Sequence, residues 1–137
     1  MTAPPVPPLG IERAGIAVRD AGPRGRGVFA TRDFEEGETI EDCPVIEVPE
    51  AELPALASTI LSSYFFQWGG TGDEGAVALG YGSLYNHTNE PNAMYVRKRE
   101  LKLLSFVALR PIAAGEEITV SYHGGFGQRT KVWFEIE

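Results

Sequence analysis

Short apolar runs separated by turn-forming residues extend along most of this chain. The first two runs, at residues 16–18 and 27–30, flank a polar turn at 20–26, and a second polar turn follows at 33–37. Apolar side chains then recur through residues 39–48, which predicts one or two strands. Glycine and proline interrupt the pattern about every ten residues, which is typical of small all-β folds with many turns.

The second half of the chain continues this pattern. Residues 62–68 have the aromatic content of a strand, residues 69–75 form a glycine-rich turn, and residues 76–79 predict a returning strand. Residues 94–99 and 103–109 predict a hairpin. The sequence contains no internal repeat.

One segment, residues 50–60, is the only plausible helix. Pro54 is compatible with the first turn of that helix only. The apolar residues at helical spacing are Leu53, Leu56, Ala57 and Ile60. The chain is therefore predicted to be mostly β with one short helix.

The last predicted strand delivers a phenol at its end. Ile118, Val120 and Tyr122 alternate with polar residues, and the aromatic pair Trp133 and Phe134 lies near the end of the chain.

Length and composition indicate a single folded domain. The chain has 137 residues, of which 43% are hydrophobic and 23% charged, enough for one core. Residues 1–10 are proline-rich and predict an extended, flexible tail rather than a signal peptide, so we expect one domain over residues 11–137. No apolar run approaches the length of a membrane span, and we expect no membrane partner.

Charge and cysteine content narrow the function classes. The net charge of −7 argues against direct nucleic-acid binding and suits a basic protein or peptide partner. The alternative is that the negative charge only keeps the protein soluble. The single Cys43 excludes an internal disulfide and a cysteine-built zinc site, and without an activating partner it is predicted to be a packed thiol. Cytoplasmic location is the default, with the host nucleus or chromatin as the alternative for a viral or secreted protein.

Two polar motifs carry the candidate chemistry. Residues 85–92, Tyr-Asn-His-Thr-Asn-Glu-Pro-Asn, form a polar loop that no hydrophobic core requires. Residues 115–122, Gly-Glu-Glu-Ile-Thr-Val-Ser-Tyr, follow after the predicted hairpin. A third motif, Gly-Arg-Gly-Val-Phe at residues 25–29, precedes both.

These three motifs, in this order, resemble the SET domain of protein lysine methyltransferases, and most closely the minimal stand-alone viral and bacterial members. The resemblance spans about residues 15–122 and leaves residues 123–137 as a post-SET-like segment. It implies a β-clip fold of several small curved sheets with a C-terminal pseudoknot. It also implies S-adenosyl-L-methionine as cofactor and a lysine-containing protein, such as a histone tail, as substrate.

Methyl transfer to lysine is an in-line displacement by a neutral amine on a sulfonium methyl group. Alignment and desolvation contribute more to such a reaction than acid–base chemistry does. The lysine, with a reference pKa of about 10.4, must lose its proton, which an apolar channel and a nearby cation both favour.

The resemblance assigns the cofactor to the glycine turn and the polar loop. Gly25, Arg26 and Gly27 are expected to contact it through main-chain groups, because glycine permits close approach; the alternative is a plain hairpin turn. Asn86 and His87 are expected to hold its two ends, whereas a structural role is the alternative for His87.

Aromatic residues are expected to complete the site. Tyr122 is the predicted catalytic phenol and also borders the cofactor; the alternative is an ordinary tyrosine ending a strand. Tyr95 and Phe126 are predicted to line the lysine channel, with Tyr95 limiting the number of methyl groups or serving only as a strand aromatic. Trp133 and Phe134 are expected either to stack on adenine or to close the core.

Other polar residues are predicted to have no chemical role. Glu116 and Glu117 are neighbours on a strand and point to opposite faces, so they cannot act as an acid–base pair. The two histidines, His87 and His123, without a cysteine cluster predict no metal site.

Three interpretations therefore remain open from the sequence: a lysine methyltransferase, a non-catalytic SET-like binding module, and a structural β domain. The binding-module interpretation is supported by Phe126-Gly127, because the smallest family members tend to have tyrosine and tryptophan in this stretch. A homodimer is plausible for so small a domain. The target lysine and the methylation state are not fixed by the sequence.

Overall fold

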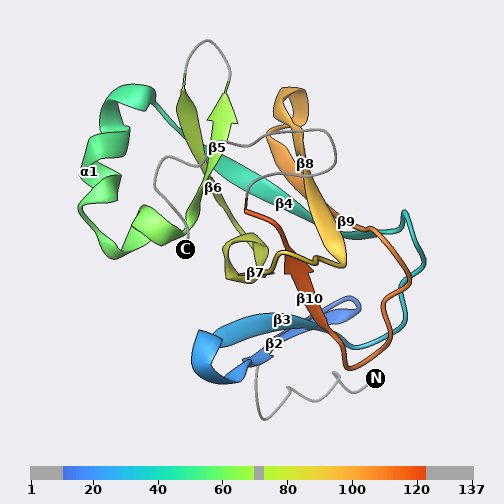
Figure 1. The fold of residues 1–137 in the computed structure, drawn as a ribbon. Helices are drawn as coiled ribbons and strands as arrows, with labels where there is room; N and C mark the ends of the chain where they lie inside the picture. Colours follow the sequence, from blue (N-terminus) through green and yellow to red (C-terminus); the bar gives the residue numbers. More distant parts are fainter. Residues whose placement is uncertain (1–10, 70–72, 123–137) are drawn as a thin grey trace, which may run out of the picture.

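The chain is mostly β, and its strands form two sheets that meet at the last strand (Figure 1). The computed structural model describes residues 11–69 and 73–122. Within those residues the first sheet has the strand order β1 (Ile11–Arg13), β2 (Ile16–Asp20), β3 (Arg26–Ala30), β10 (Glu117–Val120) and β7 (Asn86–His87). The second has the order β5 (Phe65–Gly69), β6 (Glu74–Ala78), β4 (Thr39–Val48), β9 (Leu103–Ala108) and β8 (Ala93–Lys98).

The first sheet brings the beginning and end of the described chain together. β2 and β3 form the predicted hairpin, in which Asp20 faces Arg26. β10 pairs antiparallel with β3 and parallel with β7, so the last described strand lies between two earlier ones (Figure 1). The predicted pseudoknot, in which the C-terminal segment threads through a loop, stays a prediction, because residues 123–137 lie outside the described residues.

The second sheet curves until its two edge strands touch. Arg97 on β8 donates from Nε to the carbonyl of Gln67 on β5 at 2.7 Å. The rings of Phe66 on β5 and Tyr95 on β8 pack edge to face, with centroids 5.1 Å apart. The curved sheets predicted from the family resemblance are therefore present.

The strand predictions hold with small shifts. β4 is one strand of ten residues with a register shift near Thr39. β8 and β9 form the expected hairpin, whose turn contains Lys102 at φ 54°. β10 ends at Val120, two residues before Tyr122, and Asn86–His87 forms a short strand within the segment predicted to be a loop.

The helix is shorter than predicted. α1 covers Leu53–Ala57 and follows a 3-10 turn at Glu50–Glu52, so the prediction of a helix over residues 50–60 was wrong at its end. Leu53 is buried against Val48 and Phe65, in a small cluster separate from the main core. This contact anchors the helix to the second sheet.

Thr59 ends the helical segment. Its backbone is extended, and its hydroxyl donates to the carbonyl of Leu56 at 2.7 Å, which offers the chain an alternative to another helical turn. A 3-10 turn at Ile60–Ser63 follows. Ile60 is therefore 80% exposed instead of lying on the apolar face of the helix.

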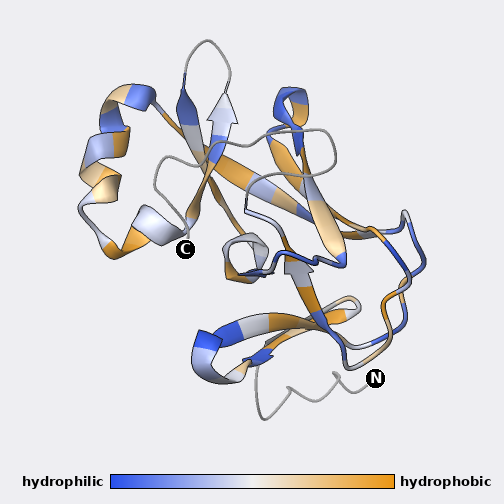
Figure 2. Ribbon diagram, in the orientation of Figure 1, coloured by the Kyte–Doolittle hydropathy of each residue, from blue (hydrophilic) through white to orange (hydrophobic). Residues whose placement is uncertain are grey.

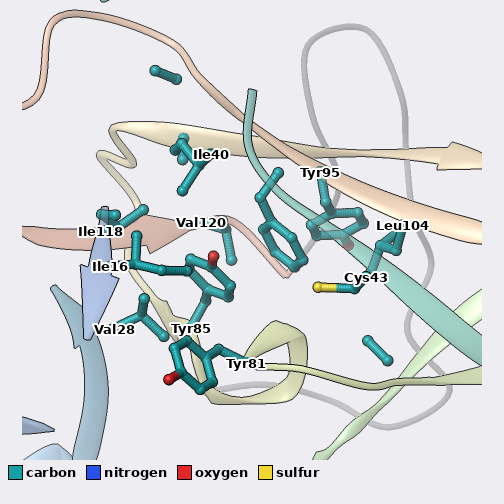
Figure 3. Close-up of a cluster of buried hydrophobic side chains, with 14 of the residues drawn as sticks. Ile16, Val28, Ile40, Cys43, Tyr81, Tyr85, Tyr95, Leu104, Ile118 and Val120 are labelled. Atoms are coloured by element: carbon teal, nitrogen blue, oxygen red, sulfur yellow. The ribbon is translucent and has the colours of Figure 1, made fainter. Parts of the chain in front are cut away.

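The main core lies between the two sheets. Figure 3 shows side chains from both sheets in this cluster, including Ile16, Val28 and Leu104. Cys43 belongs to it and is fully buried, as predicted for a packed thiol. Figure 2 shows apolar residues along the strands and polar residues at the outer turns, which is the pattern that buries one face of each sheet.

None of the helices in the described part of the chain is long and apolar enough to cross a membrane.

Candidate functional site

The three sequence motifs meet along β10. Thr119 pairs with Asn86, Val120 with His87, and on the other edge Ile118 pairs with Val28 next to the glycine turn. The short strand therefore pairs with segments that precede it by about 90 and about 30 residues in the sequence. Gly25–Gly27, the Asn86-His87 pair and Tyr122 are held near one another by this pairing.

The two glycines of the turn have different roles. Gly25 has φ +82°, a conformation that favours glycine, and no described atom lies within 4 Å of where its Cβ would stand. Gly27 does not have a positive φ. A Cβ there would lie 2.5 Å from Oε2 of Glu117 and 2.8 Å from Nδ2 of Asn86, so any larger residue would force these two side chains to shift.

Asn86 ties the polar loop to the glycine turn. Its side-chain amide donates to the carbonyl of Arg26 at 3.1 Å and to Oε2 of Glu117 at 2.7 Å. The Arg26 side chain is exposed, so its main chain provides this contact. The amide orientation is thus fixed by two acceptors on neighbouring strands.

Glu117 and Arg24 are site residues that the sequence analysis missed. Glu117 accepts from Asn86 and forms an ion pair with Arg24, whose side chain is half exposed. Glu116 points elsewhere and accepts from Arg110 and from the main chain of Ala113. The prediction that the two carboxylates face different ways is confirmed by their different partners.

The His87 side chain braces the backbone of Tyr122. Its Nδ1 accepts a hydrogen bond from the main-chain N–H of Tyr122 at 3.0 Å. Because Nδ1 is the acceptor, the proton of the neutral ring is assigned to Nε2. The two rings lie 5.1 Å apart. The imidazole therefore makes a structural contact and the main chain of His87 pairs with β10, while the expected cofactor role of His87 stays a prediction.

The Tyr122 phenol is half-buried and held at its oxygen. Its hydroxyl donates to the carbonyl of Tyr85 at 2.8 Å. Burial raises the pKa of Tyr122 above its ordinary value, and the neighbouring phenols of Tyr64 and Tyr95 raise it further. The group is therefore a neutral dipole at physiological pH.

Tyr95 lies beside Tyr122, and its channel role stays a prediction. Its hydroxyl donates to the main-chain carbonyl of Tyr122 at 3.3 Å, and its ring packs against Phe66 and Phe106. The side chain is almost fully buried. The phenol of Tyr64, at the end of the turn before β5, also raises the pKa of Tyr122, and Tyr64 was not singled out from the sequence.

Asn92 holds the main chain of β10 through its side chain. It is buried, its amide donates to the carbonyl of Glu117, and its oxygen accepts from the main-chain N–H of Thr119, each at 2.8 Å. The side chain therefore satisfies main-chain groups of β10 as a neighbouring strand would. This explains the asparagine at the end of the polar loop.

Three predicted site residues lie outside the described residues: Phe126, Trp133 and Phe134. Their expected roles stay predictions. In the described ranges, no group of three or more histidine, cysteine, aspartate or glutamate residues is arranged to hold a metal ion.

Comparisons with known proteins agree with the geometry. Residues 25–123 match the model of the SET domain family. A histone-lysine N-methyltransferase of Schizosaccharomyces pombe, specific for H3 lysine-37, is 32% identical over 126 residues, which cover 91% of this chain and 80% of that protein. A crystal structure of a candidate histone methyltransferase from Plasmodium falciparum has a TM-score of 0.63 and 28% identity, covering 81% of this chain and 99% of that one.

Proposed function

Because this chain belongs to the SET domain family, we propose that it is an S-adenosylmethionine-dependent protein-lysine N-methyltransferase. The observation that carries the proposal is the position of Tyr122. Its phenol is half-buried beside Tyr95, and its main chain is bound to the strand pair that also holds Asn86. A dipole fixed in this way is suited to stabilise charge that is redistributed during methyl transfer.

The residues around the glycine turn fit the proposed cofactor. S-adenosylmethionine supplies a methyl group on a positively charged sulfonium. Gly25 has a positive φ and open space where a Cβ would stand, which leaves room for a ligand beside its main chain. The nearby ion pair provides a positive group on Arg24 and a negative group on Glu117. The main-chain groups of Gly25–Gly27, together with Asn86 and His87, would hold the cofactor.

Tyr122 would orient the lysine amine. The proton of its hydroxyl is engaged by the Tyr85 carbonyl, so the lone pairs of the oxygen remain to accept a hydrogen bond from an incoming N–H group. The raised pKa keeps the phenol neutral, and it does not act as a base. Its contribution is alignment of the amine for in-line attack.

The proposed substrate is a lysine in a basic protein segment. The net charge of −7 favours encounter with such a partner. Histones are suggested by the relatives, one of which is named as specific for lysine 37 of histone H3. Tyr95, with its hydroxyl directed to the Tyr122 backbone, would limit space beside the amine and favour low-order methylation.

The proposal is tested by transfer of a labelled methyl group from S-adenosylmethionine to core histones. We expect wild-type protein to label histone lysines. We expect Tyr122→Phe to reduce kcat by about a hundredfold or more, since one oriented dipole is lost. Calorimetric binding of S-adenosylhomocysteine should be retained in the variant, which serves as the folding control.

The alternative function is a non-catalytic binding module. The reason to consider it is Phe126-Gly127, where the sequence departs from the family pattern. Binding of S-adenosylmethionine without any labelled product would favour the module. Wild-type kcat in Tyr122→Phe would refute the role of this phenol.

A further inference from the structure

A carboxylate is buried in the core, away from the sequence motifs. Glu41 on β4 is only 6% exposed, and it lies between Ile40 and Cys43, which both belong to the main core. Burying a charged group is costly unless hydrogen bonds compensate for the lost water. The hydrogen-bond partners of the Glu41 carboxylate therefore indicate its role in the structure.

Two hydrogen-bond partners of Glu41 lie at the two ends of the same short turn. Oε2 accepts from the main-chain N–H of Tyr81 at 3.0 Å, and Oε1 accepts from the phenol of Tyr85 at 2.8 Å. Between them lies the 3-10 turn Gly82–Leu84. One carboxylate thus fixes both ends of this turn against β4.

Tyr85 is held firmly by its side chain. Its ring stacks on Phe106 with centroids 4.0 Å apart and an interplanar angle of 12°. Figure 3 shows Tyr81 and Tyr85 within the core cluster, near the β4 residues Ile40 and Cys43. The ring stack and the bond to Glu41 together set the position of the Tyr85 main chain.

That main chain is the partner of the proposed catalytic phenol. The carbonyl of Tyr85 accepts the hydroxyl of Tyr122 at 2.8 Å. Glu41, Tyr85 and Tyr122 are therefore linked by consecutive hydrogen bonds, with the fixed tyrosine between the buried charge and the phenol.

We propose that Glu41 is a positioning residue for methyl transfer, which acts through Tyr85 to hold the Tyr122 hydroxyl in place. The inference rests on the proposed function. An apolar residue would be a less costly occupant of this core position if packing were its only role. The bonds to both ends of one turn favour positioning.

The neighbouring carboxylate provides a matched control. Asp42 is exposed on the other face of β4 and accepts from the hydroxyl of Ser105 at 2.5 Å. It has the same kind of hydrogen bond on the same strand. Its hydrogen bond goes to β9 and not to Tyr85 or Tyr122.

Steady-state kinetics on histone substrate would compare Glu41→Gln, Tyr85→Phe and Asp42→Asn. Tyr85→Phe keeps the ring that stacks on Phe106 and removes the hydroxyl that bonds Glu41. We expect kcat to fall on the order of tenfold in this variant and in Glu41→Gln, with KM for S-adenosylmethionine within about twofold of wild type. Asp42→Asn should retain wild-type kcat.

A double-mutant cycle separates positioning from general stability. Because Glu41 acts through the Tyr122 hydroxyl, Glu41→Gln should have little further effect on kcat in a Tyr122→Phe background. Equal losses in both backgrounds would overturn the inference. So would lower melting temperatures with unchanged kcat in Glu41→Gln and Tyr85→Phe.

A second readout does not depend on turnover. The ring resonance of Tyr122, assigned in carbon-labelled protein by its loss in Tyr122→Phe, should shift in Tyr85→Phe and not in Asp42→Asn. An unmoved resonance contradicts the positioning role. Absence of turnover in the wild type contradicts the proposed function instead, so the two failures are distinguishable.

Discussion

At the scale of single residues, the site depends on close contacts more than on unusual side chains. Gly27 is the clearest case, because two polar side chains occupy the space that a Cβ would need. Those side chains, Glu117 and Asn86, also hold the glycine turn against the polar loop. A larger residue at Gly27 would therefore disturb the contact between the glycine turn and the polar loop, whereas there is open space at Gly25.

Gly27→Ala should therefore weaken cofactor binding. The new methyl group must displace Glu117 or Asn86, and overpacking of this kind costs about 1–3 kcal/mol. We expect a higher Kd for S-adenosylhomocysteine by calorimetry.

Gly37→Ala is the control for Gly27→Ala. Gly37 has φ +82° and open space around it, so alanine there should cost about 1–2 kcal/mol of unfolding free energy through backbone strain alone. Cofactor affinity should be unchanged in this variant. Equal affinities in the two variants would contradict the packing role of Gly27.

At the scale of elements, the helical segment shows how local signals compete. Leu53 is buried in a small cluster with Val48 and Phe65, whereas Ile60 is exposed after Thr59 has ended the helix. The two apolar residues looked equivalent in the periodicity of the sequence. Their contributions to stability should differ accordingly.

Leu53→Ala should lower the unfolding free energy by about 2–5 kcal/mol, because a buried side chain is replaced by a cavity. Ile60→Ser should change it by less than about 0.5 kcal/mol, because the side chain is already in water. Denaturant unfolding measures both. A similar loss in the two variants would show that Ile60 is packed in solution.

The sequence predicted individual helices and strands better than it predicted which of them pair with one another. The β8–β9 hairpin followed from alternation and a turn, and the packed position of Cys43 followed from the lack of an activating partner in the sequence. The end of α1 was missed because the Thr59 hydroxyl competes with the helix through local hydrogen bonds.

The site was predicted only in part, because local motifs are visible in the sequence and contacts between distant strands are not. Asn86 and Tyr122 were identified from motifs, and the pairing of β10 with β7 brings their segments together. Glu117 and Arg24 were missed, because their contact depends on the register between distant strands and no local pattern encodes it. Glu41 was missed because a single acidic residue in a strand gives no sign of being buried.

At the scale of the whole molecule, two curved sheets enclose the proposed site from different sides. The first supplies the glycine turn and Asn86, and the second supplies Tyr95 (Figure 1). Tyr122 follows β10 and lies against both. Its burial therefore reports on the correct assembly of the two sheets.

The raised pKa of Tyr122 predicts a pH dependence of stability. The folded protein holds the phenol proton more tightly than the unfolded chain, whose ordinary value is 10.0. This contribution is fully present below about pH 10 and is lost as pH rises through the folded pKa. Unfolding free energies measured from neutral to alkaline pH should fall less steeply in Tyr122→Phe than in wild type. Identical slopes would show that the phenol is solvated.

The crystal structure of the complex with S-adenosylhomocysteine tests the central claim most directly. We predict ligand density bordered by the main chain of Gly25–Gly27 and by Asn86 and His87, with the sulfur atom facing the hydroxyl of Tyr122. Density at any other place, or a sulfur atom remote from Tyr122, would contradict the assignment of these motifs to a single methyl-transfer site.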